Sequence, residues 1–200
     1  MEITAQMVKD LREKTGVGMM DCKKALTETD GDFEEAIVYL RKKGLANAAK
    51  RSGRSALQGV ISNYVHTGAS IGVLVELNCE TDFVSRSDDF NAFGRDVAIH
   101  IAAANPVWVK SEDVPEEIIN KEKEIYMAAA RESGKPEKVL EKIAEGKLLK
   151  FYEDNCLMSQ RFVKDPDKTI GDMMADMLTK IGEKMEIRRF ARFQVGEEIK

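Results

Sequence analysis

The start of the chain carries a periodic pattern of apolar residues that predicts a helix. Val8 and Leu11, with Met7 beside them, recur at helical spacing. Thr4 precedes them with a side chain that can cap the amino end, and Gly16 follows as the kind of residue that ends a helix in the left-handed conformation. The residues between Thr4 and Gly16 are therefore expected to form a helix with one buried face.

Two further helices are predicted in the same region. One follows Gly18, and the next begins at Asp32, where Glu35 three residues later suits a capping box. Their apolar residues are Met19, Met20, Cys22, Ala25 and Leu26 in the first, and Phe33, Ala36, Ile37 and Leu40 in the second. Ala46 to Gly59 is rich in Ala, Ser and Gly, which is typical of a helix tail that runs into a linker.

Alternating apolar and polar residues predict strands further along the chain. Val60 to Val65 and Ile71 to Cys79 flank the turn-like segment His66 to Ala69, which favours an antiparallel hairpin. Ile187 to Val195 alternates in the same way, with Arg188 and Arg192 facing away from the apolar side. This last strand is expected to join the hairpin in one sheet.

The remaining segments have helical patterns. Residues 87–104 carry an apolar side formed by Phe90, Phe93, Val97 and Ile101. Pro115 and Pro136 are expected to open two helices at the first helical position, and Gly134 to end the first of them. The inward residues of the second are predicted to be Val139, Leu140, Ile143 and Phe151. A last helix, capped by Thr169, carries a methionine stripe from Met173 to Met177 that suits a core or a subunit edge.

Together these elements predict an α+β protein. A three-helix module with a basic linker is expected at residues 1–53, and a core of a small antiparallel sheet packed with helices at residues 54–200.

Composition narrows the class of protein. Of the 200 residues 43% are hydrophobic and 33% charged, which is globular, and the net charge of −4 argues against a whole-chain electrostatic grip on nucleic acid. No apolar run approaches the about 20 residues that cross a bilayer. The three cysteines, Cys22, Cys79 and Cys156, match neither a disulfide framework nor Cys-x-x-Cys spacing. We therefore expect a soluble cytoplasmic protein with no membrane or direct nucleic-acid partner.

One basic segment leaves an alternative open. No acidic residue lies between Glu35 and Glu76, and the basic residues there are Arg41, Lys42, Lys43, Lys50, Arg51 and Arg54. Residues 41–54 could serve a nucleic-acid or ribosome-binding accessory module, whose binding would fall steeply with salt. No aromatic residue is interleaved with these charges, which instead favours a solvated face.

Candidate catalytic groups are scarce. His66 lies in the predicted turn and His100 on the apolar side of a helix, and neither has an obvious partner. The sequence contains no His-Glu-x-x-His, Gly-x-Ser-x-Gly or Walker A pattern, and Gly16-Val17-Gly18 lacks the third glycine and the preceding strand of a dinucleotide site. We expect no enzyme activity, no catalytic residue, no metal and no cofactor.

Two local features could instead form contact surfaces. Met19 and Met20 are adjacent and cannot both point into a small core, so one of them suits an adaptable contact, unless Met20 is buried and Met19 covers the helix junction. Phe83 beside Asp82, after the second strand, could form an interface anchor. Composition alone favours the alternative, in which Phe83 folds back on Phe90 and Asp82 caps a turn.

Four segments carry a likeness to a known family: Leu11 to Leu26 (LREKTGVGMMDCKKAL), Gly72 to Val84 (GVLVELNCETDFV), Phe162 to Asp165 and Arg188 to Phe190. In these segments the chain resembles bacterial elongation factor Ts, the guanine nucleotide exchange factor for elongation factor Tu. The likeness covers essentially the whole chain. It is to the short members with a single core, because long members carry a second half-core and a coiled-coil insertion.

The resemblance implies specific contacts. The three-helix module would be a ubiquitin-associated-like unit that docks on the G domain of elongation factor Tu, with Met19, Met20 and Lys23 as contact candidates. Thr81, Asp82, Phe83 and Val84 would insert near the magnesium ion and phosphate-binding loop of that partner. Phe83 would act as a wedge, Asp82 would hold neighbouring groups, and GDP would leave so that GTP can bind.

Two expectations concern assembly and rival functions. A single-core chain is expected to form a homodimer, through the outer faces of the last strand and its methionine-bearing helix. A ubiquitin-like adaptor module attached to an unrelated core is a further alternative, in which replacing Phe83 would leave activity untouched.

Overall fold

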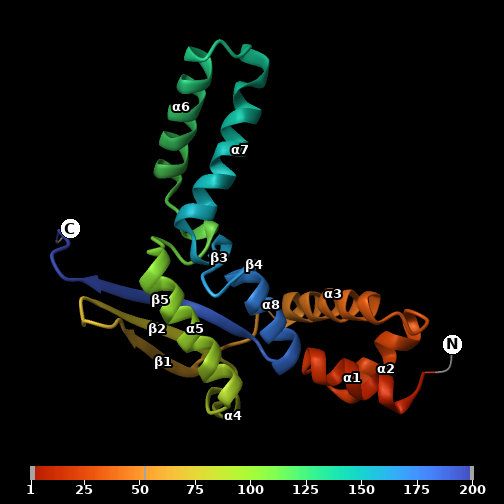
Figure 1. Ribbon diagram of the computed structural model, residues 1–200. Coiled ribbons are helices and arrows are strands. Elements are labelled where there is room, and N and C mark those ends of the chain that lie inside the picture. The colour runs from red at the N-terminus through yellow and green to blue at the C-terminus, as the bar shows by residue number, and fades with distance from the viewer. Residues whose placement is uncertain (1–2, 52, 199–200) are drawn as a thin grey trace. The chain divides into compact units, whose positions relative to one another are not determined.

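The computed structural model describes residues 3–51 and 53–198 and confirms the α+β class (Figure 1). Its helices are α1 (Ala5–Thr15), α2 (Met19–Glu28), α3 (Phe33–Arg51), α4 (Asp82–Ser85), α5 (Asp88–Ala104), α6 (Glu116–Glu132), α7 (Glu137–Asn155) and α8 (Ile170–Ile181). The strands are β1 (Gln58–Val65), β2 (Ile71–Cys79), β3 (Arg161–Phe162), β4 (Asp165–Thr169) and β5 (Met185–Gln194). Two 3-10 turns, Ser111–Asp113 and Leu157–Ser159, complete the described elements.

Helices α1 to α3 form the predicted N-terminal module. Thr4 caps α1 by accepting a hydrogen bond from the Met7 amide at 3.2 Å, and Gly16 ends it with a φ of 69°. Asp32 accepts from the Glu35 amide at 2.8 Å at the start of α3. The buried core of the module consists of Val8, Leu11, Val17, Cys22, Ala25, Leu26, Ala36 and Leu40. This arrangement fits the ubiquitin-associated-like module expected from the sequence.

Helix α3 continues past that core and packs against α8. A Cβ atom on Gly44 would lie 2.7 Å from the Cβ of Thr179 on α8, so the two backbones approach more closely than a larger residue would allow. Arg41 of α3 also forms an ion pair with Asp172 of α8.

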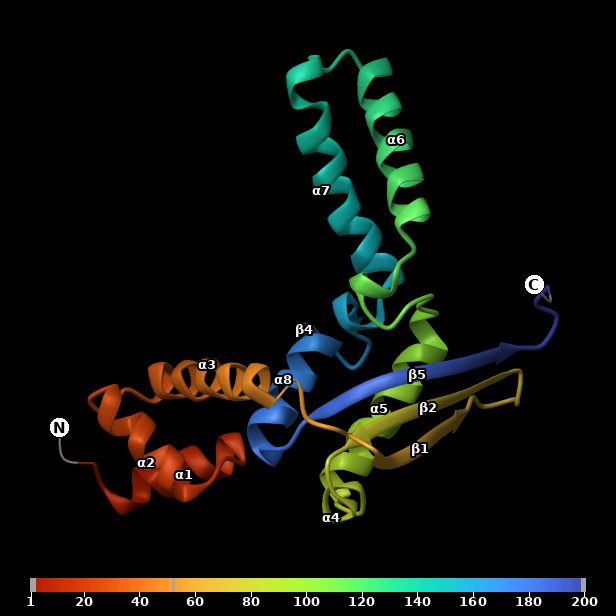
Figure 2. The same ribbon diagram turned by 180° about the vertical axis from the view of Figure 1, so that it is seen from behind.

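The main sheet has the strand order β1-β2-β5 (Figure 2). This order confirms that β1 and β2 are paired neighbours and that the last strand, β5, joins them in one sheet. The His66 amide donates to the Ile71 carbonyl at 2.9 Å and closes the hairpin. The central strand β2 buries one alternating set of side chains, Val73, Val75, Leu77 and Cys79.

Helix α5 covers one face of this sheet (Figure 1). A Cβ on Gly94 would lie 3.1 Å from the Cβ of Ser62 and 3.5 Å from a methyl group of Leu77, which identifies the covered face. The predicted apolar side of the helix, Phe90, Phe93, Val97 and Ile101, is buried. The contacts of Gly94 with Ser62 and Leu77 hold the first half of α5 against β1 and β2, and so position the segment between β2 and α5.

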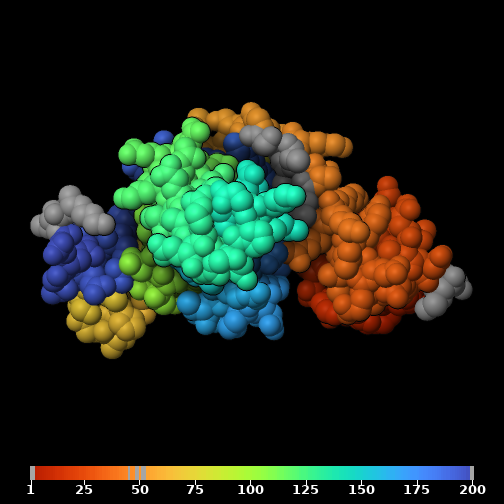
Figure 3. All heavy atoms as spheres, turned by 90° about the horizontal axis from the view of Figure 1, so that it is seen from above, coloured from red at the N-terminus to blue at the C-terminus, as the bar shows by residue number. Residues whose placement is uncertain are grey.

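Helices α6 and α7 form an antiparallel hairpin, and in Figure 3 their green and teal side chains are in direct contact. Pro115 and Pro136 occupy the N-cap positions, not the first helical positions as predicted, because each has an extended backbone with ψ near 140° (137° and 142°). Leu140 is buried as predicted, but Val139 is 38% exposed. The buried residues of α7 are Leu140, Ala144 and Leu148, which follow a strict four-residue spacing.

The described chain separates into two compact units. The first contains the residues up to Ser62 together with Glu76–Gly94 and Asp172–Ile187. The second contains Asn63–Val75, Arg95–Gly171 and the residues from Arg188 on. The boundary between residues 53 and 54 proposed from composition stays a prediction. Among the described residues, no helix combines the length and the apolar character needed to span a membrane.

Candidate protein-interaction site

A short helix, α4, begins three residues after the end of β2. Thr81 has an extended backbone and acts as the N-cap, and its Oγ1 accepts a hydrogen bond from the Val84 amide at 3.4 Å. The Ser85 amide donates to the Thr81 carbonyl at 3.3 Å and closes the single turn. The predicted segment Thr81 to Val84 therefore forms one structural unit.

The side chains of α4 divide between core and solvent. Val84 and Ser85 are 7% and 8% exposed, whereas the neighbouring Phe83 is 82% exposed. The alternative in which Phe83 folds back on Phe90 is wrong, because Val84 fills the inward position and leaves Phe83 pointing away. An aromatic side chain held in solvent by a buried neighbour has the form of an interface anchor.

Asp82 is exposed and does not cap the turn, as the composition-based alternative had it, because Thr81 takes that role. Its Oδ2 lies 2.9 Å from an Arg86 Nη atom, one helical turn away. Both side chains are largely exposed, so this ion pair contributes little to stability. Asp82 can thus exchange Arg86 for another partner at small cost.

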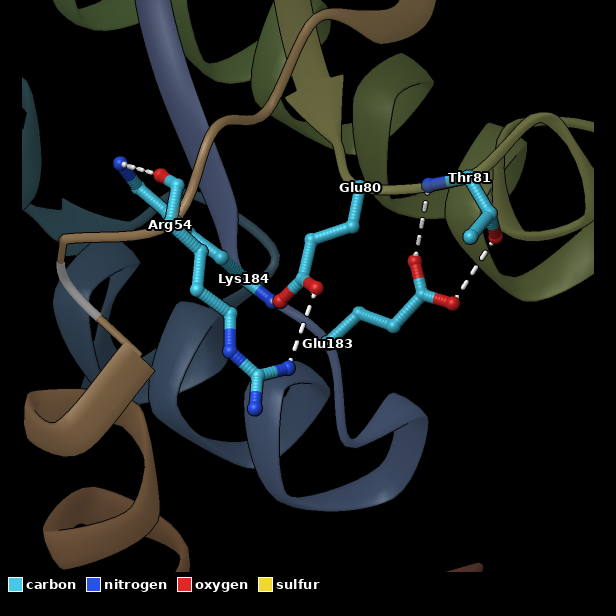
Figure 4. Close-up of polar contacts among 5 residues, drawn as sticks. All are labelled: Arg54, Glu80, Thr81, Glu183 and Lys184. Carbon is cyan, nitrogen blue, oxygen red and sulfur yellow. Dashed lines mark hydrogen bonds and ion pairs between the residues drawn. The ribbon is translucent and has the colours of Figure 1, made fainter.

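Glu183, in the loop between α8 and β5, holds Thr81 with both carboxylate oxygens (Figure 4). The Thr81 amide donates to Oε2 at 3.1 Å, and the Thr81 hydroxyl donates to Oε1 at 2.8 Å. The Cys79 thiol donates to the Thr81 carbonyl at 3.1 Å. Every polar group of Thr81 therefore has a partner within the protein.

Glu80 ties the same loop to the segment that follows α3 (Figure 4). Its Oε1 accepts from the Lys184 amide at 2.6 Å, and its Oε2 accepts from the Arg54 guanidinium at 3.2 Å. The Lys184 ammonium group donates to the Arg54 carbonyl at 2.9 Å. Three segments far apart in the sequence thus meet beside α4.

Sequence reasoning missed these polar partners. Glu183 lies 102 residues from Thr81, and Lys184 lies 104 residues from Glu80. A local pattern cannot pair residues at such separations. The one available signal was Gly182, which marks a turn just before the last strand and so places Glu183 and Lys184 in a loop.

The thiols of Cys22, Cys79 and Cys156 are expected to have low reactivity. Cys79 is buried, and burial together with the negative charge of Glu183 raises the pKa of its thiol. Burial likewise raises the pKa of Cys156 to about 11 and that of Cys22 above its ordinary value. A protonated buried thiol is a weak nucleophile. None of the three cysteines forms a disulfide.

A second exposed group lies on α2. Met20 is 78% exposed, Met19 is 41% exposed and Lys23 is also exposed, so the alternative with Met20 in the core is wrong. The opposite side of α2, formed by Cys22, Ala25 and Leu26, fills the core of the module. The structure thus places Met19, Met20 and Lys23 in one exposed patch on α2, and Thr81, Asp82 and Phe83 in another at α4, whereas Val84 lies in the core.

The two histidines have partners that the sequence did not predict. His66 Nδ1 lies 3.0 Å from the Tyr64 hydroxyl, and His100 Nε2 lies 3.0 Å from the Gln160 side-chain oxygen. Neither histidine is paired with a nucleophile or a carboxylate in these contacts. Within the described part of the chain, no group of three or more His, Cys, Asp or Glu residues has the arrangement of a metal site.

The fold and these two patches define a class of protein: an α+β scaffold with exposed apolar side chains on α2 and α4. A model of the family described as elongation factor TS matches residues 2–197. An elongation factor Ts of Geobacter sulfurreducens is 59% identical over 197 residues, covering 98% of this chain and 91% of the relative. That of Fervidobacterium nodosum is 59% identical and covers 98% and 100%. That of Syntrophobacter fumaroxidans is 56% identical over 198 residues and covers 99% of each.

The chain belongs to the elongation factor Ts family, as its sequence motifs had indicated. Its role is therefore that of a translation elongation factor.

Proposed function

We propose that this chain is a guanine nucleotide exchange factor for elongation factor Tu, which binds the GDP complex and releases GDP. The observation that carries the proposal is Phe83, 82% exposed on a helix whose next residue is buried. Exposing a large aromatic side chain has a cost in water, which a partner that covers Phe83 removes. Family membership makes elongation factor Tu the expected partner.

The mechanism follows from binding linkage. A factor that binds the nucleotide-free partner more tightly than the GDP complex must weaken GDP binding by the same ratio. Phe83 would enter between helices of the partner near its magnesium ion and phosphate-binding loop, and Asp82 would engage groups beside it. Release of GDP lets GTP bind, and no covalent step on this chain is required.

The N-terminal module would supply a second contact. Met19, Met20 and Lys23 form an exposed patch on α2, and methionine side chains adapt to the shape of a partner surface. A module docked through this patch keeps the partner bound while α4 acts on the nucleotide site. We expect Met20→Ala to weaken binding and to leave the maximal release rate closer to that of the wild type than Phe83→Ala does.

Stopped-flow release of fluorescent GDP from elongation factor Tu tests the proposal. The wild-type chain should accelerate release strongly, and Phe83→Ala should lose at least about tenfold, the loss expected for removing a central interface anchor. Leu149→Ala is the matched control, because Leu149 on α7 is 65% exposed and lies outside both patches. A folded wild-type protein that does not accelerate release would contradict the proposal.

The nucleic-acid alternative has less support. Of the basic residues in the 41–54 segment, Arg41, Lys43 and Arg54 form ion pairs with carboxylates of this chain. These pairs reduce the charge that could neutralise phosphates. Binding of RNA by the whole chain with a steep dependence on salt, together with no effect on GDP release, would favour this alternative.

A further inference from the structure

We propose that Glu183 is a positioning residue of the exchange reaction, because its carboxylate sets the orientation of Thr81 and thereby of the helix that carries Asp82 and Phe83. The inference rests on the proposed exchange function. Glu183 acts through Thr81 and is not itself a contact candidate.

Helix α4 cannot orient itself. It contains four residues, and a single isolated turn is unfavourable because several backbone dihedrals are fixed for one hydrogen bond. Its orientation must come from contacts with the rest of the first unit. Val84 and Ser85 give such contacts by entering the core, but both lie at the carboxyl end of the turn and leave its amino end to be held by other groups.

The carboxylate of Glu183 supplies the second contact. It accepts from the amide and from the hydroxyl of Thr81, at 3.1 Å and 2.8 Å, so two donors of one residue are held by one group. Two parallel charge-assisted hydrogen bonds fix direction as well as distance. With Val84 on one side and Thr81 on the other, the direction of Phe83 between them is determined.

The same carboxylate also sets the polarity of the helix cap. A threonine hydroxyl has one hydrogen, and at Thr81 that hydrogen points to Glu183. The hydroxyl oxygen therefore presents its lone pairs to the Val84 amide, which donates to it at 3.4 Å. Without Glu183, the hydroxyl can turn and the cap loses its preferred direction.

Glu183 is itself held in place. Gly182 adopts a φ of 76° directly after α8, and the Lys184 amide on the other side donates to Glu80 at 2.6 Å. Glu80 precedes Thr81 in the sequence, so each segment holds the other: Glu80 holds the loop, and the loop holds Thr81 (Figure 4). These mutual hydrogen bonds restrict the motion of α4 and so hold the exposed Phe83 side chain in one direction.

The discriminating substitution is Glu183→Gln, which keeps the size of the side chain. The amide oxygen can accept from the Thr81 amide, but the amide nitrogen must then donate to the Thr81 hydroxyl, which reverses that hydrogen bond and turns the hydroxyl hydrogen away from position 183. Glu186→Gln is the matched control, since it removes one negative charge from β5 close by without touching Thr81. Thr81→Val is a second variant, which removes the hydroxyl and keeps the amide.

The readout is the rate of fluorescent GDP release as a function of the concentration of the full-length chain. We expect Glu183→Gln and Thr81→Val to lower the maximal rate by about tenfold or more, since a small misplacement of an acting group can reduce a rate by about a hundredfold. The half-saturating concentration should change less, because the patch on α2 is intact. Glu186→Gln should match the wild type.

Alkylation of Cys79 gives a readout independent of activity. Its thiol donates to the Thr81 carbonyl, so Thr81→Val, which keeps the negative charge of Glu183, should accelerate labelling at Cys79, while Cys22 and Cys156 in the same sample keep their wild-type rates. Mass spectrometry resolves the three positions. Equal acceleration at all three would indicate general unfolding and would overturn the proposal.

The outcomes separate the two levels of the argument. If Phe83→Ala slows release but Glu183→Gln behaves like Glu186→Gln, the positioning role is wrong and the exchange function stands. If Glu183→Gln changes only the half-saturating concentration, the residue acts in binding and the positioning role is also wrong. If the wild type does not accelerate release, the proposed function itself fails.

Discussion

His100 shows at the scale of one residue how burial fixes a protonation state. It is fully buried on α5, and its Nδ1 accepts from the Val163 amide at 3.3 Å. The proton must then lie on Nε2, which donates to Gln160 at 3.0 Å. Burial lowers the pKa of His100, so the folded protein keeps it neutral.

This protonation state predicts an acid-dependent loss of stability. In the unfolded chain the histidine binds a proton below about pH 6.5, whereas the folded state resists it, so the free energy of unfolding falls as pH falls. Between about pH 6.5 and pH 5 we expect the wild type to lose stability more steeply than His100→Asn in urea titrations. At pH 7 the variant should be less stable by about 1–3 kcal/mol, because the side-chain oxygen of Gln160 loses the donor that His100 supplies. Parallel pH profiles would contradict this account.

The candidate site could be predicted in part at this scale. Phe83 and Asp82 stood out because an aromatic and a carboxylate follow the end of a strand, and the family motif reinforced them. Exposure of Phe83 could not be predicted, because it depends on Val84 filling the core instead. Glu183 could not be predicted at all, since only the fold brings it to Thr81 across 102 positions.

At the scale of elements, the close approach of α3 and α8 depends on a glycine. Gly44 has no room for a Cβ beside Thr179, whereas Gly146 in α7 has open space around it. Gly44→Ala should therefore destabilise the protein by about 1–3 kcal/mol through overpacking. Gly146→Ala should stabilise it by about 0.5–1 kcal/mol, because alanine favours a helix interior.

Thermal or urea unfolding of the two glycine variants checks this contrast. Opposite signs are expected, since the same substitution meets a backbone crossing at one site and solvent at the other. Equal stabilisation by both would show that α3 and α8 do not approach as described.

The elements themselves were largely predictable from the sequence. The capped helices of the module, the hairpin and α5 each combine a clear apolar period with local start or stop residues. The apolar side of α7 was predicted less well, because Val139 and Leu140 are adjacent and only packing against α6 decides which is buried. Leu140 is 1% exposed and Val139 is 38% exposed.

At the scale of the whole molecule, one face of the sheet carries exposed apolar residues. Leu74 alternates with buried Val73 and Val75, and Phe193 follows Arg192, whose guanidinium donates to the Ala102 carbonyl on α5. Leu74 and Phe193 therefore lie on the face away from α5, and they are 49% and 65% exposed. By contrast, Met174 of α8 is buried, and Met173 and Met177 are half-buried.

We propose that this sheet face, which includes the last strand but not the methionine-bearing helix of the interface expected from the sequence, joins two copies of the chain. Multi-angle light scattering should then give twice the mass of one chain, and Phe193→Asp should shift the protein to monomer by placing a charge in the interface. Leu149→Asp, at an equally exposed position on α7, should leave the dimer intact. A monomeric wild type that exchanges at full rate would contradict the proposal.

The central claim is that Phe83 couples binding of this chain to loss of GDP from elongation factor Tu. The most direct test is a closed binding cycle: the affinity of this chain for nucleotide-free elongation factor Tu and for its GDP complex, and the affinity of GDP with and without this chain. We expect this chain to lower the affinity for GDP by the same factor by which GDP lowers the affinity for this chain. This factor should be well above one for the wild type and closer to one for Phe83→Ala. A wild-type factor of one, or a factor unchanged in Phe83→Ala, would contradict it.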